Sequence, residues 1–367
     1  MKLAIQLYTL RDIIRDEETL ADALLHLRQM GYEGVEFAGL YDIPAPRVRQ
    51  IVEQAGMHAL SCHVSLDAME QELDGVLEDA RALGLDTVAM AWSAADSPEA
   101  IINDPEIDVV CVFVPPFVRK EYVLAAAKAG KQIVATKPLA ADLSDAREMT
   151  EAVEQAGVRC GVIYRRTNNP VIEAYKEIFS GGEFGKLALY KQDWLHHYPT
   201  WNRWATDPQK NGGPFMDAML HNLNAARYLM GRRVVGRAFF SDDHTHSLAC
   251  DDTQFLKVDF EQGASAHLFI TWAAELAVYD SAKNDREHID QCFMVTDQGW
   301  LFRNEIREGK AVITATRNGL EKDFPVIPFE ETFFDRYAKE IKNRDILPAD
   351  LPDIREAYED LRILLEN

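Results

Sequence analysis

Three residues in the middle of the chain have side chains that can move a proton during the oxidation of an alcohol. Lys137 lies at the end of an apolar segment, where partial removal from water lowers the pKa of an ammonium group. Asp217 and His221 are four residues apart, a spacing that places both side chains on one face of an α-helix. Oxidation of a secondary alcohol requires a base for the hydroxyl proton while hydride leaves carbon. Taken alone, each feature also fits a solvated strand end or a capped helix start.

The elements that must position these residues alternate between strand and helix up to about Tyr164. Helices end at glycines such as Gly31, Gly84 and Gly130, which favour helix termination. Strands that alternate with helices over short loops predict a parallel sheet with right-handed crossovers. We expect a single sheet of seven strands, at Leu3–Leu7, Gly34–Phe37, His58–Val64, Thr87–Trp92, Val109–Val114, Gln132–Ala135 and Arg159–Tyr164.

After Tyr164 the pattern changes to longer strands with little helix between them. A turn that carries Gly263 between two apolar runs predicts a hairpin. We therefore expect an α+β region in which one long helix, Pro214–Met230, packs on an open antiparallel sheet. The predicted strands are Leu187–Leu195, Arg237–Phe240, Gln254–Phe260, Ala264–Trp272 and Cys292–Thr296.

The length of 367 residues favours two domains. The fold class that we predict is α/β: a parallel, Rossmann-like sheet over residues 1–165, followed by the α+β domain over 166–340. Within the first domain, residues 1–95 differ in character from residues 96–165, which resemble the second half of a dinucleotide-binding domain. Helices at Glu330–Lys342 and Ile354–Leu365 are predicted, and residues 341–367 should pack back onto one of the domains.

The net charge of −21 opposes binding to nucleic acid or to anionic membranes. The five cysteines are scattered and odd in number, and no apolar run approaches the roughly 20 residues of a membrane span. We therefore expect a cytoplasmic protein. The loop Asp242–His246 has the composition of a metal site, but its spacing fits no standard one, so we expect no metal.

Four segments after about Ser97 occur in a characteristic order: Asn103–Pro116, Ala126–Leu139 with its Thr136-Lys-Pro, Tyr164-Arg-Arg166 and Gly212–His221. Through them the chain, from about Ser97 to its end, resembles the glucose–fructose oxidoreductase / inositol dehydrogenase / MocA (Gfo/Idh/MocA) family, with Thr136 in place of the Glu of the Glu-Lys-Pro signature. This resemblance implies hydride transfer between NAD or NADP and a secondary alcohol of a sugar or cyclitol. It also implies a homo-oligomer formed through the open sheet.

The same resemblance assigns roles to individual residues. His221 would be the general acid/base, Asp217 would orient it or bind a hydroxyl, and Lys137 would share the proton relay. Cofactor contacts are implied for Pro115, Pro116, Lys137 and Arg165, and substrate contacts for Tyr164, His197 and Trp204.

Within residues 1–92, three segments have a different character: Lys2–Arg11, Gly31–Gly39 and Ala59–Ser65. Through them this part of the chain resembles the first half of a xylose-isomerase-like sugar-phosphate isomerase/epimerase barrel. After the first strand the chain reads Tyr8-Thr-Leu-Arg11, without the glycines that let a pyrophosphate approach the backbone. Glu36 ends the second strand, where a dinucleotide-binding fold has a ribose-binding acid, so it is a further cofactor candidate.

Our leading hypothesis is an NAD(P)-dependent oxidoreductase whose cofactor binding is impaired by the missing glycine loop. One alternative is a catalytically inactive pseudoenzyme or an engineered fold chimera. Another is a sugar-phosphate isomerase/epimerase, which is disfavoured because the later barrel strands and their metal ligands are missing.

Overall fold

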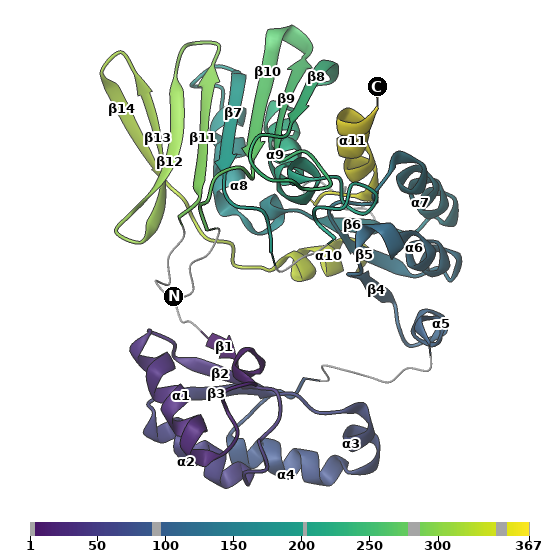
Figure 1. Ribbon diagram of the computed structural model, residues 1–367, viewed down its shortest axis with the longest axis vertical. Helices are drawn as coiled ribbons and strands as arrows, with labels where there is room; N and C mark the ends of the chain where they lie inside the picture. Colours follow the sequence, from purple (N-terminus) through teal and green to yellow (C-terminus); the bar gives the residue numbers. More distant parts are fainter. Residues whose placement is uncertain (1–3, 90–96, 201–203, 278–286, 343–350, 367) are drawn as a thin grey trace. The chain divides into compact units, whose positions relative to one another are not determined.

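The computed structural model describes residues 4–89, 97–200, 204–277, 287–342 and 351–366. The chain forms two compact units, Met1–Ala100 and Ile101–Asn367 (Figure 1). The two units are defined by contacts between residues within the chain. The predicted boundaries near residues 165 and 340 divide the chain by function instead, and they stay a prediction. None of the described helices is long and apolar enough to cross a membrane.

The first unit contains a parallel sheet with the strand order β1-β2-β3. Helix α1 begins at an Asp16 cap, whose side chain accepts the backbone N–H of Thr19, and helix α4 ends at Gly84 in the left-handed conformation. The elements are β1 (Ala4–Gln6), α1 (Glu17–Gln29), β2 (Gly34–Phe37), α2 (Ala45–Gln54), β3 (His58–Cys62), α3 (Leu66–Gln71) and α4 (Leu73–Leu83).

The predicted strand Thr87–Trp92 is described only as far as Ala89, and its last three residues lie outside the described part. Ala89 pairs with His63 in a parallel bridge, next to β3. Dinucleotide-binding folds instead add their fourth strand beside the first. The resemblance to an isomerase barrel stays a prediction.

The second unit begins with another parallel sheet, in the order β4-β5-β6. The described strands of the predicted seven form two parallel sheets of three, one in each unit. Their union in a single sheet stays a prediction. Strand–helix alternation predicts parallel units, but it does not specify which strands pair. The elements here are α5 (Pro98–Asn103), β4 (Val109–Val112), α6 (Arg119–Lys128), β5 (Gln132–Thr136), α7 (Leu143–Ala156) and β6 (Cys160–Ile163).

An eight-stranded, mostly antiparallel sheet follows, in the order β14-β13-β12-β11-β7-β10-β9-β8 (Figure 1). Only β7 and β10 pair in parallel. The predicted fold class is confirmed, although the sequence analysis missed the last three strands; self-association through this sheet stays a prediction. The strands are β7 (Leu187–Leu195), β8 (Val234–Asp242), β9 (Thr253–Phe260), β10 (Ala264–Thr271), β11 (Ile289–Thr296), β12 (Leu301–Arg307), β13 (Lys310–Arg317) and β14 (Leu320–Pro325).

Helices cover one face of this sheet and hold the largest core of the molecule. Leu223 and Ala226 of α9 (Leu220–Met230) are buried together with Leu256 and Leu268 of β9 and β10. Helix α8 (Pro170–Ser180) contacts α9, and α11 (Ile354–Leu365) contacts both α7 and α9. In α10 (Phe333–Lys342), the Tyr337 hydroxyl donates to the backbone carbonyl of Ile133 at 2.6 Å. Helices α10 and α11 thus both contact elements of the second unit. The predicted division that sets residues 341–367 apart as a returning segment stays a prediction.

Candidate active site

Lys137 follows β5, at the carboxyl edge of the β4-β5-β6 sheet. Its Nζ donates a hydrogen bond to the backbone carbonyl of Asp217. Burial lowers the pKa of Lys137, although the nearby Asp217 carboxylate opposes this effect. A lysine with a lowered pKa has more neutral amine near pH 7, and neutral amine is the form that accepts a proton.

Asp217 lies in a π-helix, η4 (Phe215–Met219), which continues into α9. An α-helix is predicted from Pro214 onward, whereas this first turn is a π-helix, in which backbone hydrogen bonds join residues i and i+5. The chain enters this turn through Gly212 and Gly213, whose φ values of 80° and 98° favour glycine. Asp217 Oδ1 accepts from Asn211 Nδ2 at 3.4 Å, and burial raises the pKa of Asp217 while Lys137 opposes the rise.

His221 is oriented by the backbone of Arg165 rather than by Asp217. Its Nδ1 accepts the Arg165 backbone N–H at 3.0 Å, and the described residues show no hydrogen bond between His221 and Asp217. Since Nδ1 accepts this bond, the neutral ring carries its proton on Nε2. Burial lowers the pKa of His221 well below its ordinary value, with a further contribution from the charge of Lys137. His221 is therefore a neutral ring that presents an N–H donor.

A buried arginine that the sequence analysis did not single out organises the Lys137 turn. Arg119 is 2% exposed and begins α6. Its guanidinium donates to the carbonyl of Val114 at 2.7 Å, to Thr136 Oγ1 at 2.9 Å and to the carbonyls of Thr136, Pro138 and Leu139. It thereby joins the segments that follow β4 and β5. No sequence signal distinguishes Arg119 from its exposed neighbours in the same helix.

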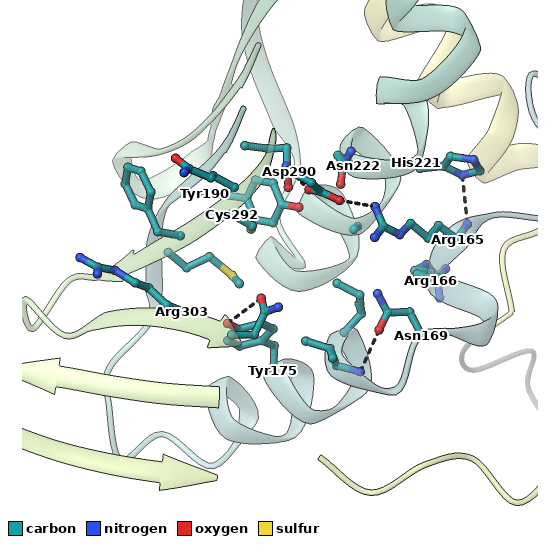
Figure 2. Close-up of a pocket in the computed structure, with 18 residues that line it drawn as sticks. Arg165, Arg166, Asn169, Tyr175, Tyr190, His221, Asn222, Asp290, Cys292 and Arg303 are labelled. Atoms are coloured by element: carbon teal, nitrogen blue, oxygen red, sulfur yellow. Dashed lines mark hydrogen bonds and ion pairs between the residues drawn. The ribbon is translucent and has the colours of Figure 1, made fainter. Parts of the chain in front are cut away.

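A cavity of about 530 Å³ is lined by His221 and by residues of β7, β11, β12, α8 and α9 (Figure 2). Arg165 links two sides of this cavity. The Arg165 backbone N–H contacts His221, and Arg165 Nη1 pairs with Asp290 Oδ2 at 2.9 Å. Gln192 Nε2 donates to the other Asp290 oxygen at 2.7 Å. A cavity with a guanidinium, a carboxylate and an amide suits a ligand with several hydroxyl groups. Sequence reasoning found Arg165 and His221 but missed Asp290 and Gln192.

The three predicted substrate residues lie in different surroundings. Tyr164 is buried, and its ring lies edge-on to His221 with the centroids 6.1 Å apart. Trp204 packs edge-on against Phe117, centroids 6.1 Å apart, close to the predicted cofactor residue Pro116. His197 lies beside His246, centroids 5.1 Å apart. The substrate contacts of all three stay a prediction.

The residues predicted to contact the nicotinamide follow three neighbouring strands. Pro115 and Pro116 follow β4, Lys137 follows β5 and Arg165 follows β6. Since carboxyl ends of adjacent parallel strands meet at one edge, these residues share the edge where α/β folds bind ligands. Their contacts with a cofactor stay a prediction.

In the first unit, the segment after β1 differs from the glycine loop that binds a pyrophosphate in dinucleotide-binding folds. After β1 the chain enters a short 3₁₀ helix, Leu7–Leu10, which contains no glycine and buries Leu7. Glu36 at the end of β2 is engaged by Gln6 at 2.7 Å, by His63 at 3.0 Å and by Ser61. Hydrogen bonds from Ser61 and Gln6 lower the pKa of Glu36. Its proposed contact with a ribose stays a prediction.

Comparison with known families supports the same class of protein. Residues 20–164 match the oxidoreductase family with an NAD-binding Rossmann fold, and residues 172–285 match the GFO/IDH/MocA C-terminal domain. The chain therefore belongs to the Gfo/Idh/MocA oxidoreductase family. The first match begins after β1 and the 3₁₀ helix, so it does not include the segment where a glycine loop would lie.

Individual relatives are sugar or cyclitol dehydrogenases by name. The chain is 26% identical to scyllo-inositol 2-dehydrogenase (NAD(+)) of Bacillus subtilis, over 72% of each chain. It is also 26% identical to myo-inositol 2-dehydrogenase of Thermotoga maritima, over 78% of this chain and 82% of the relative. Among solved structures, levoglucosan dehydrogenase in complex with NADH has a TM-score of 0.60 at 18% identity, covering 99% and 95% of the two chains. Aldose–aldose oxidoreductase from Caulobacter crescentus has a TM-score of 0.61 at 17% identity, covering 99% and 96%. These two structural matches show the fold.

Proposed function

We propose that this chain oxidises a secondary alcohol of a sugar or cyclitol with NAD(H) or NADP(H). The observation that carries the proposal is the convergence of Lys137, Asp217 and His221 in a chain of this family. Two segments about 80 positions apart supply these residues: Lys137 bonds to the Asp217 backbone, its charge acts on His221, and His221 lines the polar cavity.

Lys137 and His221 have different roles at the substrate oxygen. In its neutral form Lys137 accepts the hydroxyl proton, which its lowered pKa favours. His221 donates its Nε2–H to the same oxygen and stabilises the charge that develops there as the proton leaves. The side chains of Arg165, Asp290 and Gln192 hold neighbouring hydroxyl groups and fix the sugar in one orientation.

The chain has residues suited to the nicotinamide end of a dinucleotide, whereas the segment after β1 is less suited to its pyrophosphate. Pro115, Pro116, Lys137 and Arg165 would hold the nicotinamide end, which accepts hydride when it is bound. The Leu7–Leu10 helix provides no glycine loop for the pyrophosphate. The affinity should therefore be weaker than that of a dehydrogenase with a complete loop.

Fluorescence titration with NADH and NADPH tests this proposal. We expect saturable binding with a Kd below about 1 mM, corresponding to roughly 4 kcal/mol or more of binding free energy. The absence of binding at millimolar NADH and NADPH would contradict the proposal and would favour the inactive alternative.

Turnover is tested by incubating the chain with inositols and aldoses in the presence of NAD⁺ or NADP⁺ and following absorbance at 340 nm. In a reacting pair, His221→Ala should lower kcat by roughly 10²- to 10⁴-fold, because the donor to the substrate oxygen is lost. The control is His267→Ala, a histidine on the opposite face of the eight-stranded sheet, which should keep full activity. Equal kcat in His221→Ala and the unmodified chain would rule out the assigned role.

A further inference from the structure

Three potential metal ligands meet where segments of the eight-stranded sheet end. His197 follows β7, His246 lies in the loop between β8 and β9, and Glu275 follows β10. One ligand atom from each of the three lies within 4.8 Å of the other two. The proposed dehydrogenase chemistry uses none of them as a group, so the cluster requires a separate explanation.

The distances between the ligand atoms of the cluster are those expected for ligands arranged around a metal ion. His197 Nε2 lies 3.4 Å from Glu275 Oε2, and His246 Nε2 lies 3.8 Å from Glu275 Oε1. A direct hydrogen bond between a charged imidazole and a carboxylate would be shorter, about 2.7–2.9 Å. Ligand atoms that surround Zn²⁺ tetrahedrally at about 2.0–2.1 Å are separated by roughly 3.3 Å. The cluster therefore has room for an ion among its three ligands.

Both imidazoles are held from outside the cluster. His197 Nδ1 bonds to the backbone carbonyl of Tyr198 at 3.0 Å, which leaves the Nε2 lone pair facing Glu275. The loop that carries His246 is held by Asp252, a fully buried carboxylate that accepts the backbone N–H of His246 at 3.1 Å and that of Thr245 at 2.9 Å. The two histidines are thus held in place by contacts within the protein.

Binding of an ion to His246 would require its ring proton to move from one nitrogen to the other. Its Nε2 lies 3.1 Å from the backbone carbonyl of Trp272, a contact that places a proton on Nε2 in the metal-free chain. An ion at Nε2 would replace that proton, and the neutral ring would then carry its proton on Nδ1.

We propose that His197, His246 and Glu275 form a binding site for a divalent transition-metal ion of the Zn²⁺ type. Two imidazole nitrogens and one carboxylate are ligands that Zn²⁺ prefers, whereas Ca²⁺ and Mg²⁺ prefer sites made only of oxygens. Glu275 is 72% exposed, so water has access to the remaining coordination positions. A bound ion would tie the ends of β7 and β10 to the β8–β9 loop. The expectation of no metal site, which came from sequence spacing alone, is replaced by this proposal.

Calorimetric titration of the full chain with Zn²⁺, after dialysis against EDTA, tests the site. We expect one Zn²⁺ per chain and a rise in Tm on binding. His197→Ala and His246→Ala should each weaken Zn²⁺ binding at least tenfold and abolish the rise in Tm. Excess Mg²⁺ should not compete. The matched control is His244→Ala, because His244 is an exposed histidine in the same loop that lies outside the cluster.

Co²⁺ absorption provides a second readout that does not depend on the variants folding. Binding at this site should produce visible d–d bands without a thiolate-to-metal charge-transfer band, because the proposed ligands include no cysteine. The proposal is overturned by any of three results: no Zn²⁺ binding at 1 mM, unchanged affinity in both histidine variants, or a thiolate band.

Discussion

At the scale of single residues, Arg119 connects the candidate active site to the sheet below it. Its guanidinium is held by backbone carbonyls on both sides of Lys137, and burial lowers its pKa to about 10, so it remains charged at neutral pH. No carboxylate is needed to hold it, because carbonyl oxygens at the strand ends accept its hydrogen bonds. Arg119 is therefore a positioning residue for the Lys137 turn.

Arg119→Met should damage activity and stability together. The variant leaves buried carbonyls without donors, which costs about 2–3 kcal/mol and lowers Tm by roughly 5–10 °C. Displacement of the Lys137 turn should lower kcat roughly 10- to 100-fold. Calorimetry and steady-state kinetics measure the two effects.

The neighbouring Lys120→Met provides a matched control for this experiment. Lys120 forms partly exposed ion pairs with Asp145 and Glu148, which contribute little to stability. An Arg119→Met enzyme with unchanged kcat would show that Arg119 has only a structural role.

Lys137 should determine how oxidation depends on pH. Because burial lowers its pKa from the ordinary 10.5, kcat/KM for oxidation should rise with pH and level off below that value. His221 should add no inflection near pH 6.5, because burial lowers its pKa well below that point and the ring is already neutral. In the Lys137→Met variant, the remaining kcat/KM should no longer rise with pH. If kcat/KM still rises with pH in this variant, an ionisable group other than Lys137 causes the rise.

At the scale of elements, the C-terminal helix α11 contacts the two segments that carry His221 and Arg165. Asp360 of α11 is fully buried and accepts hydrogen bonds from Arg227 and, at 2.9 Å, from Asn224, both on α9. Glu356 of the same helix pairs at 3.0 Å with Arg166, which follows the residue that orients His221. Helix α11 thereby links α9 to the segment that follows β6.

The two partners of the buried ion pair should differ in their effect on stability. Arg227→Met leaves the Asp360 carboxylate buried without its cation and should cost about 3–5 kcal/mol. Asp360→Asn removes the charge and keeps an acceptor, so it should cost less, about 1–2 kcal/mol. Urea denaturation followed by tryptophan fluorescence measures both.

Arg355→Ala controls for the loss of an arginine near this network, since Arg355 pairs with Glu154 at the surface and should be nearly neutral. If Asp360→Asn proves as destabilising as Arg227→Met, the argument from an uncompensated charge fails.

At the scale of the whole molecule, the two units have separate hydrophobic cores. Leu20, Val35 and Val48 belong to the core of the first unit, whereas Leu223 and Leu268 belong to that of the second. Separate cores provide a physical reason for separate unfolding transitions.

Urea denaturation should therefore show two transitions. All described tryptophans lie in the second unit, so in a Trp92→Phe background the fluorescence reports that unit alone. Far-UV circular dichroism reports both units, and its midpoint should differ from that of fluorescence. Coincident midpoints would instead show that the units unfold as one cooperative body.

Local patterns in the sequence predicted several elements closely. The predicted bounds of β7 and α11 agree with the structure. Helix α11 begins at Asp353, whose side chain accepts the backbone N–H of Glu356, and it repeats buried residues at helical spacing. Caps, periodicity and glycine stops are properties of neighbouring residues, so they are visible before the chain folds.

Elements that depend on distant partners were missed. Strand β14 is almost entirely exposed and carries Glu321, Lys322 and Asp323, so it lacks the apolar alternation of a half-buried strand. Its hydrogen bonds with β13 define it as a strand. The π-helical turn at Asp217 likewise has no signature in the local sequence pattern.

The sequence by itself determined the class of the fold and, through family resemblance, led us to propose Lys137, Asp217 and His221 as the catalytic residues. Tertiary structure alone decided that Arg119 holds the Lys137 turn, that the Arg165 backbone orients His221, and that His197, His246 and Glu275 meet. The contacts of Lys137 with Asp217 and of His221 with Arg165 join residues 80 and 56 positions apart. Proximity over such separations is set by strand pairing and helix packing, which no short stretch of sequence contains.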